Sequence, residues 1–592
     1  MRLCIFRAAC CWIVSFLACT AALAQQQIEA AGPDIVIHGG RIIDGTGNPW
    51  YVGDIGITDG RIVAIGKIPS GIAKRVIEAK GLVVAPGFID MLGQSETALL
   101  IDNRSVSKLA QGITSEITGE GGSIAPQNAL TIAAAQPSLD PYHLKIDWNT
   151  LDEYWQRLAK KGTPINIGTY VGAAQAREAV LGDVNRAPMA EELEKMKALV
   201  AQAMQQGALG ISTALIYPPG HYAKTEELIE LAKVAASYGG IYATHMRSEG
   251  QNEVAAVREA LRIGQEAGLP VEIFHLKVSG KGRAGKMIEI VRMIQEARDR
   301  GQDVTADMYP YLAGATALAS SLPPWVADGG LNKLLERLHD PAVRQRIKTE
   351  MSSTGERTWE NLYLDSGGAA GVMVASVVNP DLKQYTGKTI AEVAELWKGS
   401  GGKPEQQGSA QQSVADHKSA PQSKDPLDTL MDFVLADKGL SGALYFIASE
   451  EDLQTGLRQP WTSIGLDANE LSLDGPLFEP HTHPRAFGSM PRFLGHYVRD
   501  LQLVPLEQAV RKITSLPAQR EHLVGRGLIK EGFFADITIF NPDAIIDKAT
   551  YTEPAQLAEG VSYVLVNGQV AFENGKATGV MAGKPLKGQG AK

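Results

Sequence analysis

Residues 241–275 read IYATHMRSEGQNEVAAVREALRIGQEAGLPVEIFH and decide the fold. The stretch begins and ends with a short apolar run, and each run finishes in a histidine, His245 or His275. Gly268 stands where a helix between the two runs would end. A strand, a helix and a second strand within about thirty residues form a βα unit, which places both strands parallel in one sheet.

The same unit recurs along the chain. Four predicted strands end 33, 30 and 32 residues apart, at 208–212, 241–245, 271–275 and 303–307. Four more strands are predicted at 83–90, 113–119, 165–171 and 462–467. Eight strands are the number that closes a (β/α)8 TIM-like barrel, which is the fold we predict.

The spacing between the seventh and eighth predicted strands is too long for one helix. We therefore expect an insertion at about residues 320–440. Within it, residues 398–425 are rich in Gly, Ser, Gln and Lys and nearly free of large apolar side chains. That composition predicts a disordered loop.

Both ends of the chain carry β-strand patterns instead of βα units. Short apolar runs flank the turn pairs Asp59-Gly60 and Asn567-Gly568, which favour tight hairpins. We expect residues 33–85 and 526–583 to build one composite β-sandwich, and residues 86–525 to form the barrel domain.

The first residues have the pattern of a secretory signal peptide, predicted over 1–24. Arg2 and Arg7 precede an apolar run that ends in Ala22-Leu23-Ala24. All four cysteines lie in this segment, which fits an exported protein that is periplasmic or secreted, with lipoprotein processing at Cys19 as the alternative. No later run is long enough to span a membrane, and a net charge of −9 argues against a nucleic-acid partner.

Three ionisable residues stand at predicted strand ends: His245, His275 and Asp467. A single histidine beside a strand is more often a packing residue than a ligand. Reactive groups in these barrels come from the carboxyl ends of strands, so the three together predict two metal ligands and a base for hydrolysis.

Over about residues 34–582 the chain resembles a known family. It is similar to the D-aminoacylase (N-acyl-D-amino-acid deacylase) branch of the amidohydrolase superfamily. The matching motifs are VIHGGRIIDGTG (36–47), GLVVAPGFID (81–90), GALGIST (207–213), YATHMRSE (242–249), FHLKVSGK (274–281), HPRAFGSMPRFLG (483–495) and RGLIKEGFFADITIFNP (526–542). The resemblance implies a β-sandwich attached to a metallohydrolase barrel.

The chain departs from the family at two metal-ligand positions. Leu92 and Gln94 replace the usual histidine pair after the first strand, so the usual binuclear site cannot form. Glu120 lies in the turn that usually carries a cysteine ligand. Some N-acetylglucosamine-6-phosphate deacetylases also lack the histidine pair and keep a Glu, His, His site with a catalytic Asp. We therefore expect Glu120, His245 and His275 to bind one divalent ion, most simply Zn²⁺; the alternative is that Glu120 is a solvated loop residue.

The resemblance also implies roles for four further residues. Lys277, Tyr309 and Arg485 match positions that contact the carboxylate end of the substrate, although Arg485 also fits a surface ion pair and Tyr309 core packing. Asp467 matches the residue that transfers the proton.

The expected activity is metal-dependent hydrolysis of the amide bond of an N-acyl amino acid, for which the resemblance implies the D configuration. Two alternatives remain at this level: a hydrolase of a dipeptide-like or cyclic amide, and a secreted protein that binds such a ligand without catalysis.

Overall fold

The computed structural model describes residues 32–69, 71, 73–399 and 425–592. The predicted signal peptide, and residues 400–424 of the predicted disordered loop, lie outside the described residues. The two edges of that loop are helical: Lys398 belongs to α14 (Ile390–Gly399), and Asp425 caps α15 (Pro426–Ala436). In the part of the chain that the structure describes, no helix is both long and apolar enough to cross a membrane.

Eight parallel strands form the predicted barrel. They are β6 (Phe88–Asp90), β7 (Ile113–Thr118), β8 (Asn166–Thr169), β10 (Gly210–Ala214), β11 (Ile241–His245), β12 (Val271–Ile273), β13 (Val304–Met308) and β17 (Thr462–Ile464). The short β9 (Val171–Gly172) continues β8 and pairs with β10. Between β17 and β6 the ring is closed by the Asp467 amide, which donates to the Leu92 carbonyl at 2.6 Å. The barrel prediction is confirmed.

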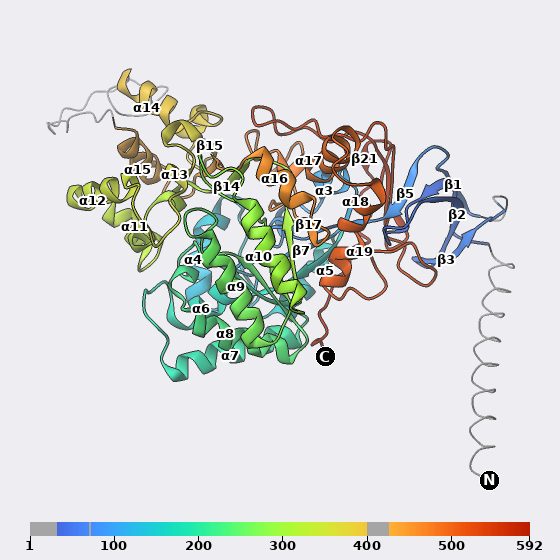
Figure 1. Cartoon of the computed structure of the whole chain (residues 1–592), viewed down its shortest axis with the longest axis horizontal. Helices are drawn as coiled ribbons and strands as arrows, with labels where there is room; N and C mark the ends of the chain where they lie inside the picture. The colour runs from blue at the N-terminus through green and yellow to red at the C-terminus, as the bar shows by residue number, and fades with distance from the viewer. Residues whose placement is uncertain (1–31, 70, 72, 400–424) are drawn as a thin grey trace, which may run out of the picture.

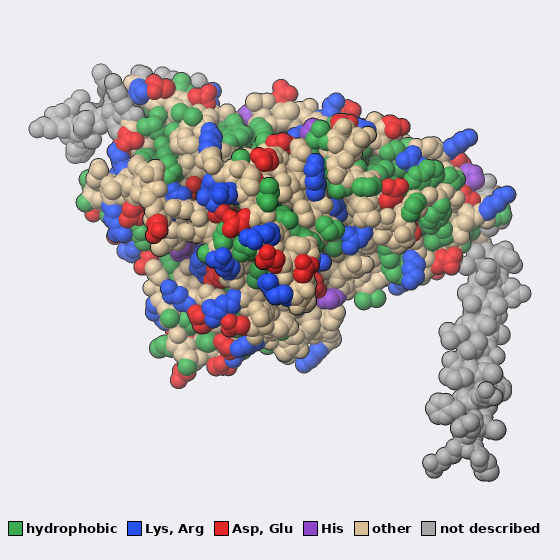
Figure 2. Space-filling model, in the orientation of Figure 1, with side chains coloured by type: hydrophobic (Ala, Val, Ile, Leu, Met, Phe, Trp, Pro, Cys, Tyr) green, Lys and Arg blue, Asp and Glu red, His purple; other side chains and the backbone are tan. Residues whose placement is uncertain are grey.

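Amphipathic helices surround this barrel; Figure 1 draws α5 to α10 in cyan to green, and α16 and α18 in orange to red. They include α5 (Leu151–Lys161), α6 (Ala173–Leu181), α7 (Ala190–Gln205), α8 (Thr225–Ser237), α9 (Glu253–Ala267), α10 (Met287–Asp299), α16 (Glu450–Leu457) and α18 (Leu506–Lys512). Helix α9 illustrates why they form: it buries Val257, Ala260 and Ile263 at helical spacing and ends at Gly268, whose φ of 72° suits the left-handed cap. Figure 2 shows acidic and basic side chains interspersed over this helical face.

Strands from both chain ends join in one nine-stranded sheet, which builds the predicted composite β-sandwich. Its order is β21-β20-β19-β18-β5-β1-β2-β3, with β4 also pairing with β1. The strands are β1 (Ile35–Ile42), β2 (Tyr51–Thr58), β3 (Arg61–Gly66), β4 (Arg75–Glu78), β5 (Val83–Pro86), β18 (Ile537–Phe540), β19 (Val561–Val566), β20 (Gln569–Glu573) and β21 (Lys576–Ala577). In Figure 1 the blue N-terminal strands lie beside the red C-terminal segments.

The single strand predicted at 83–90 is wrong, because the structure divides it into β5 and β6. The break falls at Gly87, where an added Cβ would collide with the side chain of Thr114 on β7. The chain passes from the sandwich to the barrel at this glycine, beside the domain boundary predicted between residues 85 and 86 and within the turn-type pair Pro86-Gly87.

The insertion lies between β13 and β17. It holds a small antiparallel sheet of β14 (Ala313–Ala317), β16 (Gly442–Phe446) and β15 (Val372–Ser376), together with α11 (Leu331–Arg337), α12 (Pro341–Ser352), α13 (Leu362–Asp365), α14 and α15. Its apolar core is separate from that of the barrel. Because β14 pairs with β16, the insertion extends beyond the predicted residues 320–440 on both sides. The sequence did not predict β14, since AGATA lacks the alternation of apolar and polar residues that marks a strand.

Candidate metal centre and active site

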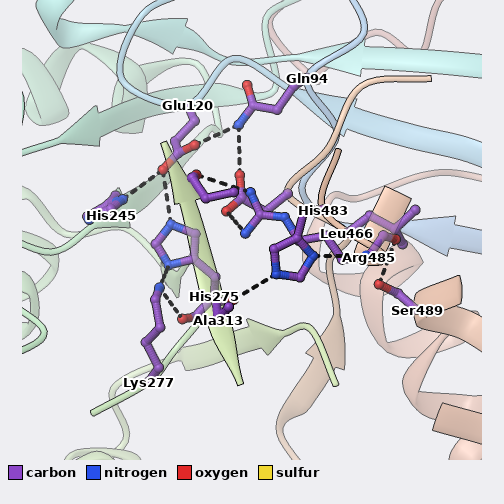
Figure 3. A network of polar contacts seen from close by, with 12 residues as sticks. Gln94, Glu120, His245, His275, Lys277, Ala313, Leu466, His483, Arg485 and Ser489 are labelled. Atoms are coloured by element: carbon purple, nitrogen blue, oxygen red, sulfur yellow. Dashed lines mark hydrogen bonds and ion pairs between the residues drawn. The ribbon is translucent and has the colours of Figure 1, made fainter. Parts of the chain in front are cut away.

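Three predicted ligands converge at the carboxyl ends of the barrel strands. The Oε1 atom of Glu120 lies 2.9 Å from Nδ1 of His245 and 3.0 Å from Nε2 of His275 (Figure 3). His245 is the last residue of β11, and His275 follows β12 with a φ of 33°. All three side chains are nearly buried. The structure therefore brings the predicted ligand set together.

Two glycines allow Glu120 to turn into the barrel mouth. Gly119 and Gly121 have φ angles of 91° and 69°, in the region that glycine adopts without strain. A Cβ on Gly119 would lie 2.7 Å from Oγ1 of Thr169, and one on Gly121 would lie 2.5 Å from Cβ of Ala214. The chain can therefore pass closely between the neighbouring strands only with glycine at both positions.

This donor set fits a zinc ion. One ligand atom from each of Glu120, His245 and His275 lies within 4.8 Å of the other two. Zinc bonds of about 2.0–2.2 Å in tetrahedral geometry place ligand atoms roughly 3.4 Å apart, close to the separations seen here. Burial alone would raise the pKa of Glu120, but the hydrogen bonds with His245 and His275 hold it well below its usual range. The carboxylate is therefore ready to act as a ligand.

Glu249 is a functional candidate that the sequence analysis did not assign. Its Oε1 atom lies 2.9 Å from Nδ1 of His275 and accepts a hydrogen bond of 2.6 Å from Nζ of Lys277. A carboxylate on the far nitrogen of a ligating histidine fixes the ring and its tautomer. Burial would raise the pKa of Glu249, but the charge of Lys277 and the two histidines lower it strongly. Its position four residues after His245, within YATHMRSE, was the available signal.

Lys277, Tyr309 and Arg485, the predicted substrate contacts, line the same cavity. The ammonium of Lys277 is bound to Glu249 and lies 5.5 Å from the ring centre of Tyr309. The guanidinium of Arg485 lies 4.6 Å from the same ring centre. Neither the Tyr309 hydroxyl nor Nε of Arg485 has a hydrogen-bond partner among the described residues, although both atoms are buried.

Asp467 lies three residues beyond β17, so the predicted strand 462–467 ends early, at Ile464. Its φ is 51°, a left-handed conformation that non-glycine residues adopt mainly where the surrounding structure imposes it. One carboxylate oxygen, Oδ2, lies 2.8 Å from Nη1 of Arg485. Burial raises the pKa of Asp467, and the charge of Arg485 opposes that rise.

The cavity that contains these residues measures about 470 Å³. The barrel strand ends form its floor, and one wall comes from the insertion through Gly314–Thr316, Ala375–Ser376 and Gly442–Tyr445. This volume is within the usual range for a small-molecule site. The insertion thus helps to shape the space available to a substrate.

Comparison with known proteins identifies the family. A model of the amidohydrolase family matches residues 471–572. D-aminoacylase from Alcaligenes xylosoxydans xylosoxydans is 34% identical over 563 residues, which cover 95% of this chain and 99% of that protein. This chain belongs to the D-aminoacylase branch of the amidohydrolase superfamily. Amidohydrolases of this branch are hydrolases of carbon–nitrogen bonds other than peptide bonds.

Two solved structures of this branch are similar over 94% of the chain and 99% of theirs. N-acyl-D-glutamate deacylase from Bordetella bronchiseptica, in complex with zinc and a phosphonate inhibitor that mimics the tetrahedral intermediate, has a TM-score of 0.75 at 30% identity. A D-aminoacylase described as having a binuclear metal centre, with one-metal activation and second-metal attenuation, has a TM-score of 0.74 at 32% identity.

The structure shows where the two residues lie that replace the histidine pair expected after the first barrel strand, Leu92 and Gln94. Leu92 is fully buried in an apolar cluster with Met91 and Phe274. Gln94 instead faces the site: its Nε2 atom donates to Oε2 of Glu120 at 2.6 Å and to Oδ1 of Asp467 at 3.3 Å. The sequence analysis identified Gln94 only as a missing histidine and did not predict these contacts.

A buried ion pair ties the first and last barrel strands together beside the site. Nζ of Lys108 lies 2.6 Å from Oδ2 of Asp90 and donates to the carbonyl of Ala468 at 2.9 Å. The other oxygen of Asp90 accepts from the amides of Leu92 and Leu466. The backbone is thus held on both sides of Asp467, and nothing in the sequence pattern indicated this clamp.

Proposed function

We propose that this amidohydrolase removes the acyl group from N-acyl-D-amino acids with a single metal ion. The observation that carries the proposal is the convergence of Glu120, His245 and His275 beside Asp467, in a site with no histidine pair for a second ion. The named activities of its relatives, D-aminoacylase and two N-acyl-D-amino-acid deacylases, support the substrate class.

In the proposed reaction, Asp467 moves the proton. A zinc ion held by Glu120, His245 and His275 would lower the pKa of the attacking water and polarise the acyl carbonyl. Asp467 accepts the proton from the attacking water and delivers it to the departing nitrogen, which would otherwise have to leave as an amine anion. The proton that Asp467 accepts in the first of these steps is thus the one that it delivers in the second.

The cationic side of the cavity would hold the substrate carboxylate. Arg485 and Lys277 both lie near the ring of Tyr309; Lys277 contributes positive charge while its ammonium contacts Glu249 and His275, and the guanidinium of Arg485 carries N–H donors suited to a carboxylate. Buried donors without partners are costly, so an anion that satisfies the Tyr309 hydroxyl and Nε of Arg485 would gain binding free energy. Holding this end of the substrate orients the amide bond toward Asp467.

A substrate panel tests the proposal. The zinc-loaded protein is assayed for release of free amine from N-acetyl derivatives of D-leucine, D-methionine and D-glutamate, their L counterparts, a D-configured dipeptide and a hydantoin. We expect hydrolysis of at least one N-acetyl-D-amino acid, in preference to its L form. Preferential opening of the hydantoin or cleavage of the dipeptide would favour the cyclic-amide or dipeptide alternative. Binding of these compounds without turnover would instead favour the non-catalytic alternative.

We also propose, on the sequence pattern of residues 1–24 alone, that the protein is exported to the periplasm or secreted. The intact mass of the protein recovered from the native host tests this, because cleavage after Ala24 leaves Gln25 as the first residue. A mass that retains residues 1–24, or one with a lipid on Cys19, would contradict cleavage at this position.

A further inference from the structure

We propose that the side-chain amide of Gln94 occupies the place that a second cation would take between Glu120 and Asp467, and so positions Asp467 in a site for one metal ion. The inference rests on the one-metal deacylase proposed above. It goes further by naming the group that makes the second ion unnecessary.

Each of the four carboxylate oxygens of Glu120 and Asp467 faces a polar partner. Oε1 of Glu120 faces both histidines, and Oδ2 of Asp467 faces Arg485. The two remaining oxygens, Oε2 of Glu120 and Oδ1 of Asp467, both approach Nε2 of Gln94, at 2.6 and 3.3 Å (Figure 3). A single nitrogen therefore joins the two carboxylates.

The chemistry of that position calls for a donor. Two carboxylates that share a neighbour repel each other unless positive charge or hydrogen-bond donors lie between them. A divalent ion would supply charge, whereas a carboxamide nitrogen supplies two N–H groups and no charge. Because both neighbours of Nε2 can only accept when ionised, the amide must present its nitrogen and not its oxygen.

The backbone keeps Gln94 in this place. The amide of Gly93 donates to the carbonyl of Ile117 at 2.6 Å, and the amide of Gln94 donates to Ala468 at 3.2 Å. The carbonyl of Leu92 accepts from the amide of Asp467. These bonds tie the residues after β6 to both β7 and the segment after β17, so the side chain of Gln94 starts from a fixed point between the two carboxylates.

Leu92 removes the other source of ligands for a second ion. Its side chain is fully buried among apolar residues and offers no ligand atom. The arrangement leaves Asp467 held by Arg485 and Gln94 through hydrogen-bonding groups alone. Its carboxylate then remains available for proton transfer instead of being committed to a metal ion.

Zinc stoichiometry tests this inference without relying on activity. The wild-type protein, Gln94→Glu, Gln94→Met and the control Gln175→Glu are equilibrated with Zn²⁺ at pH 8, desalted and analysed for bound metal. Gln175 is a matched buried glutamine that donates to the Pro126 carbonyl at 2.9 Å and, among the described residues, makes no hydrogen bond to Glu120, His245 or His275. If Gln94→Glu does not fold, as judged by circular dichroism, Gln94→His replaces it.

We expect about one zinc per chain in the wild type, Gln94→Met and Gln175→Glu, and about two in Gln94→Glu, where a third carboxylate would complete a cation site. Gln94→Met keeps the length of the side chain but has no hydrogen-bond donor. We expect its kcat to fall about 10- to 100-fold, the usual loss when a group that orients the residues of a metal site is removed. Its KM should stay within about twofold of the wild-type value. One zinc in Gln94→Glu together with normal kcat in Gln94→Met would overturn the inference. Zero or two zinc ions in the wild type would instead contradict the one-metal function itself.

Discussion

Nη1 of Arg485 lies 2.8 Å from Oδ2 of Asp467, and both side chains are largely buried. The pair joins the residue proposed to transfer the proton to the residue proposed to hold the substrate carboxylate. Burial raises the pKa of Asp467, whereas the positive charge of the Arg485 guanidinium opposes that rise and so favours the ionised form that can accept a proton. Substrate binding and proton transfer are therefore coupled through one contact.

Replacing Asp467 by asparagine should remove the proton acceptor but preserve the shape of the side chain. We expect Asp467→Asn to keep its zinc and its fold while kcat falls at least about 100-fold, the lower range for a positioned acid or base. Steady-state kinetics and metal analysis on the same preparation would measure both properties. Turnover near that of the wild type would exclude Asp467 from the chemical step.

Arg485→Gln should affect substrates according to whether they carry a carboxylate. Loss of a charged hydrogen bond costs about 1.5–3 kcal/mol, equivalent to a roughly 10- to 100-fold fall in kcat/KM. For an N-acyl amine that has no carboxylate, the fall in kcat/KM should be at least tenfold smaller than for the N-acyl amino acid, because only the contact of Arg485 with Asp467 changes. The comparison requires kcat/KM for both compounds. Equal losses would show that Arg485 acts only through Asp467.

Glu249→Gln should weaken zinc binding, although Glu249 is not proposed as a ligand. The change removes the charge that faces Nδ1 of His275 and Lys277. Loss of such an outer partner lowers metal affinity about 10- to 100-fold. Competition with a zinc chelator gives the affinity, with Glu259→Gln as the control because Glu259 pairs with Arg247 and not with the histidines. Unchanged affinity in Glu249→Gln would exclude the proposed orienting role.

Lys108→Met should destabilise the fold strongly. Lys108 is fully buried and lies 2.6 Å from Asp90 and 3.1 Å from Glu116, so its removal leaves two buried acids without a cation. Breaking a buried pair in this way costs about 3–5 kcal/mol. The midpoint of urea unfolding measures the loss, and adding Asp90→Asn should restore part of it. A midpoint equal to that of the wild type would mean that the clamp does not stabilise the barrel.

Glu360 predicts a dependence of stability on pH. It belongs to the insertion, and its Oε2 atom accepts from the amide of Glu249 at 2.6 Å. Burial, with repulsion from Glu249 and Asp365, raises the pKa of Glu360 from 4.5 to about 8. Because the folded pKa is the higher one, the stabilising contribution is complete below pH 4.5 and is lost as the pH rises through about 8.

Glu360→Gln cannot ionise, so it should lose less thermal stability than the wild type between pH 6 and pH 9. Melting temperatures of both proteins across that interval measure the difference. Parallel curves would show that the ionisation of Glu360 does not contribute.

The sequence was informative where local pattern and barrel geometry act together. His245 ends β11 and His275 lies two residues after the end of β12, and parallel strands bring such ends to one rim, so their meeting followed from spacing. Glu120 was identified because it stands at the matching point after its own strand. The sequence prediction joined the apolar residues on both sides of Pro86-Gly87 into one strand, although that pair is typical of a turn, and so missed the break at Gly87.

The contacts of Gln94, Lys108 and Glu249 were not predictable, for a different reason. Each depends on the directions of side chains that meet across the seam between the first and last strands or across adjacent loops. Loop conformation sets those directions, as the left-handed φ of 51° at Asp467 illustrates. Residue spacing carries no information about such angles.

We propose that one metal ion held by Glu120, His245 and His275 supports deacylation of an N-acyl-D-amino acid. A titration of the metal-free protein with Zn²⁺, with amine release measured after each addition, tests this proposal. We expect no activity without zinc, a linear rise as zinc is added, and a plateau at about one equivalent per chain. A plateau at two equivalents, or activity that does not depend on added metal, would contradict it.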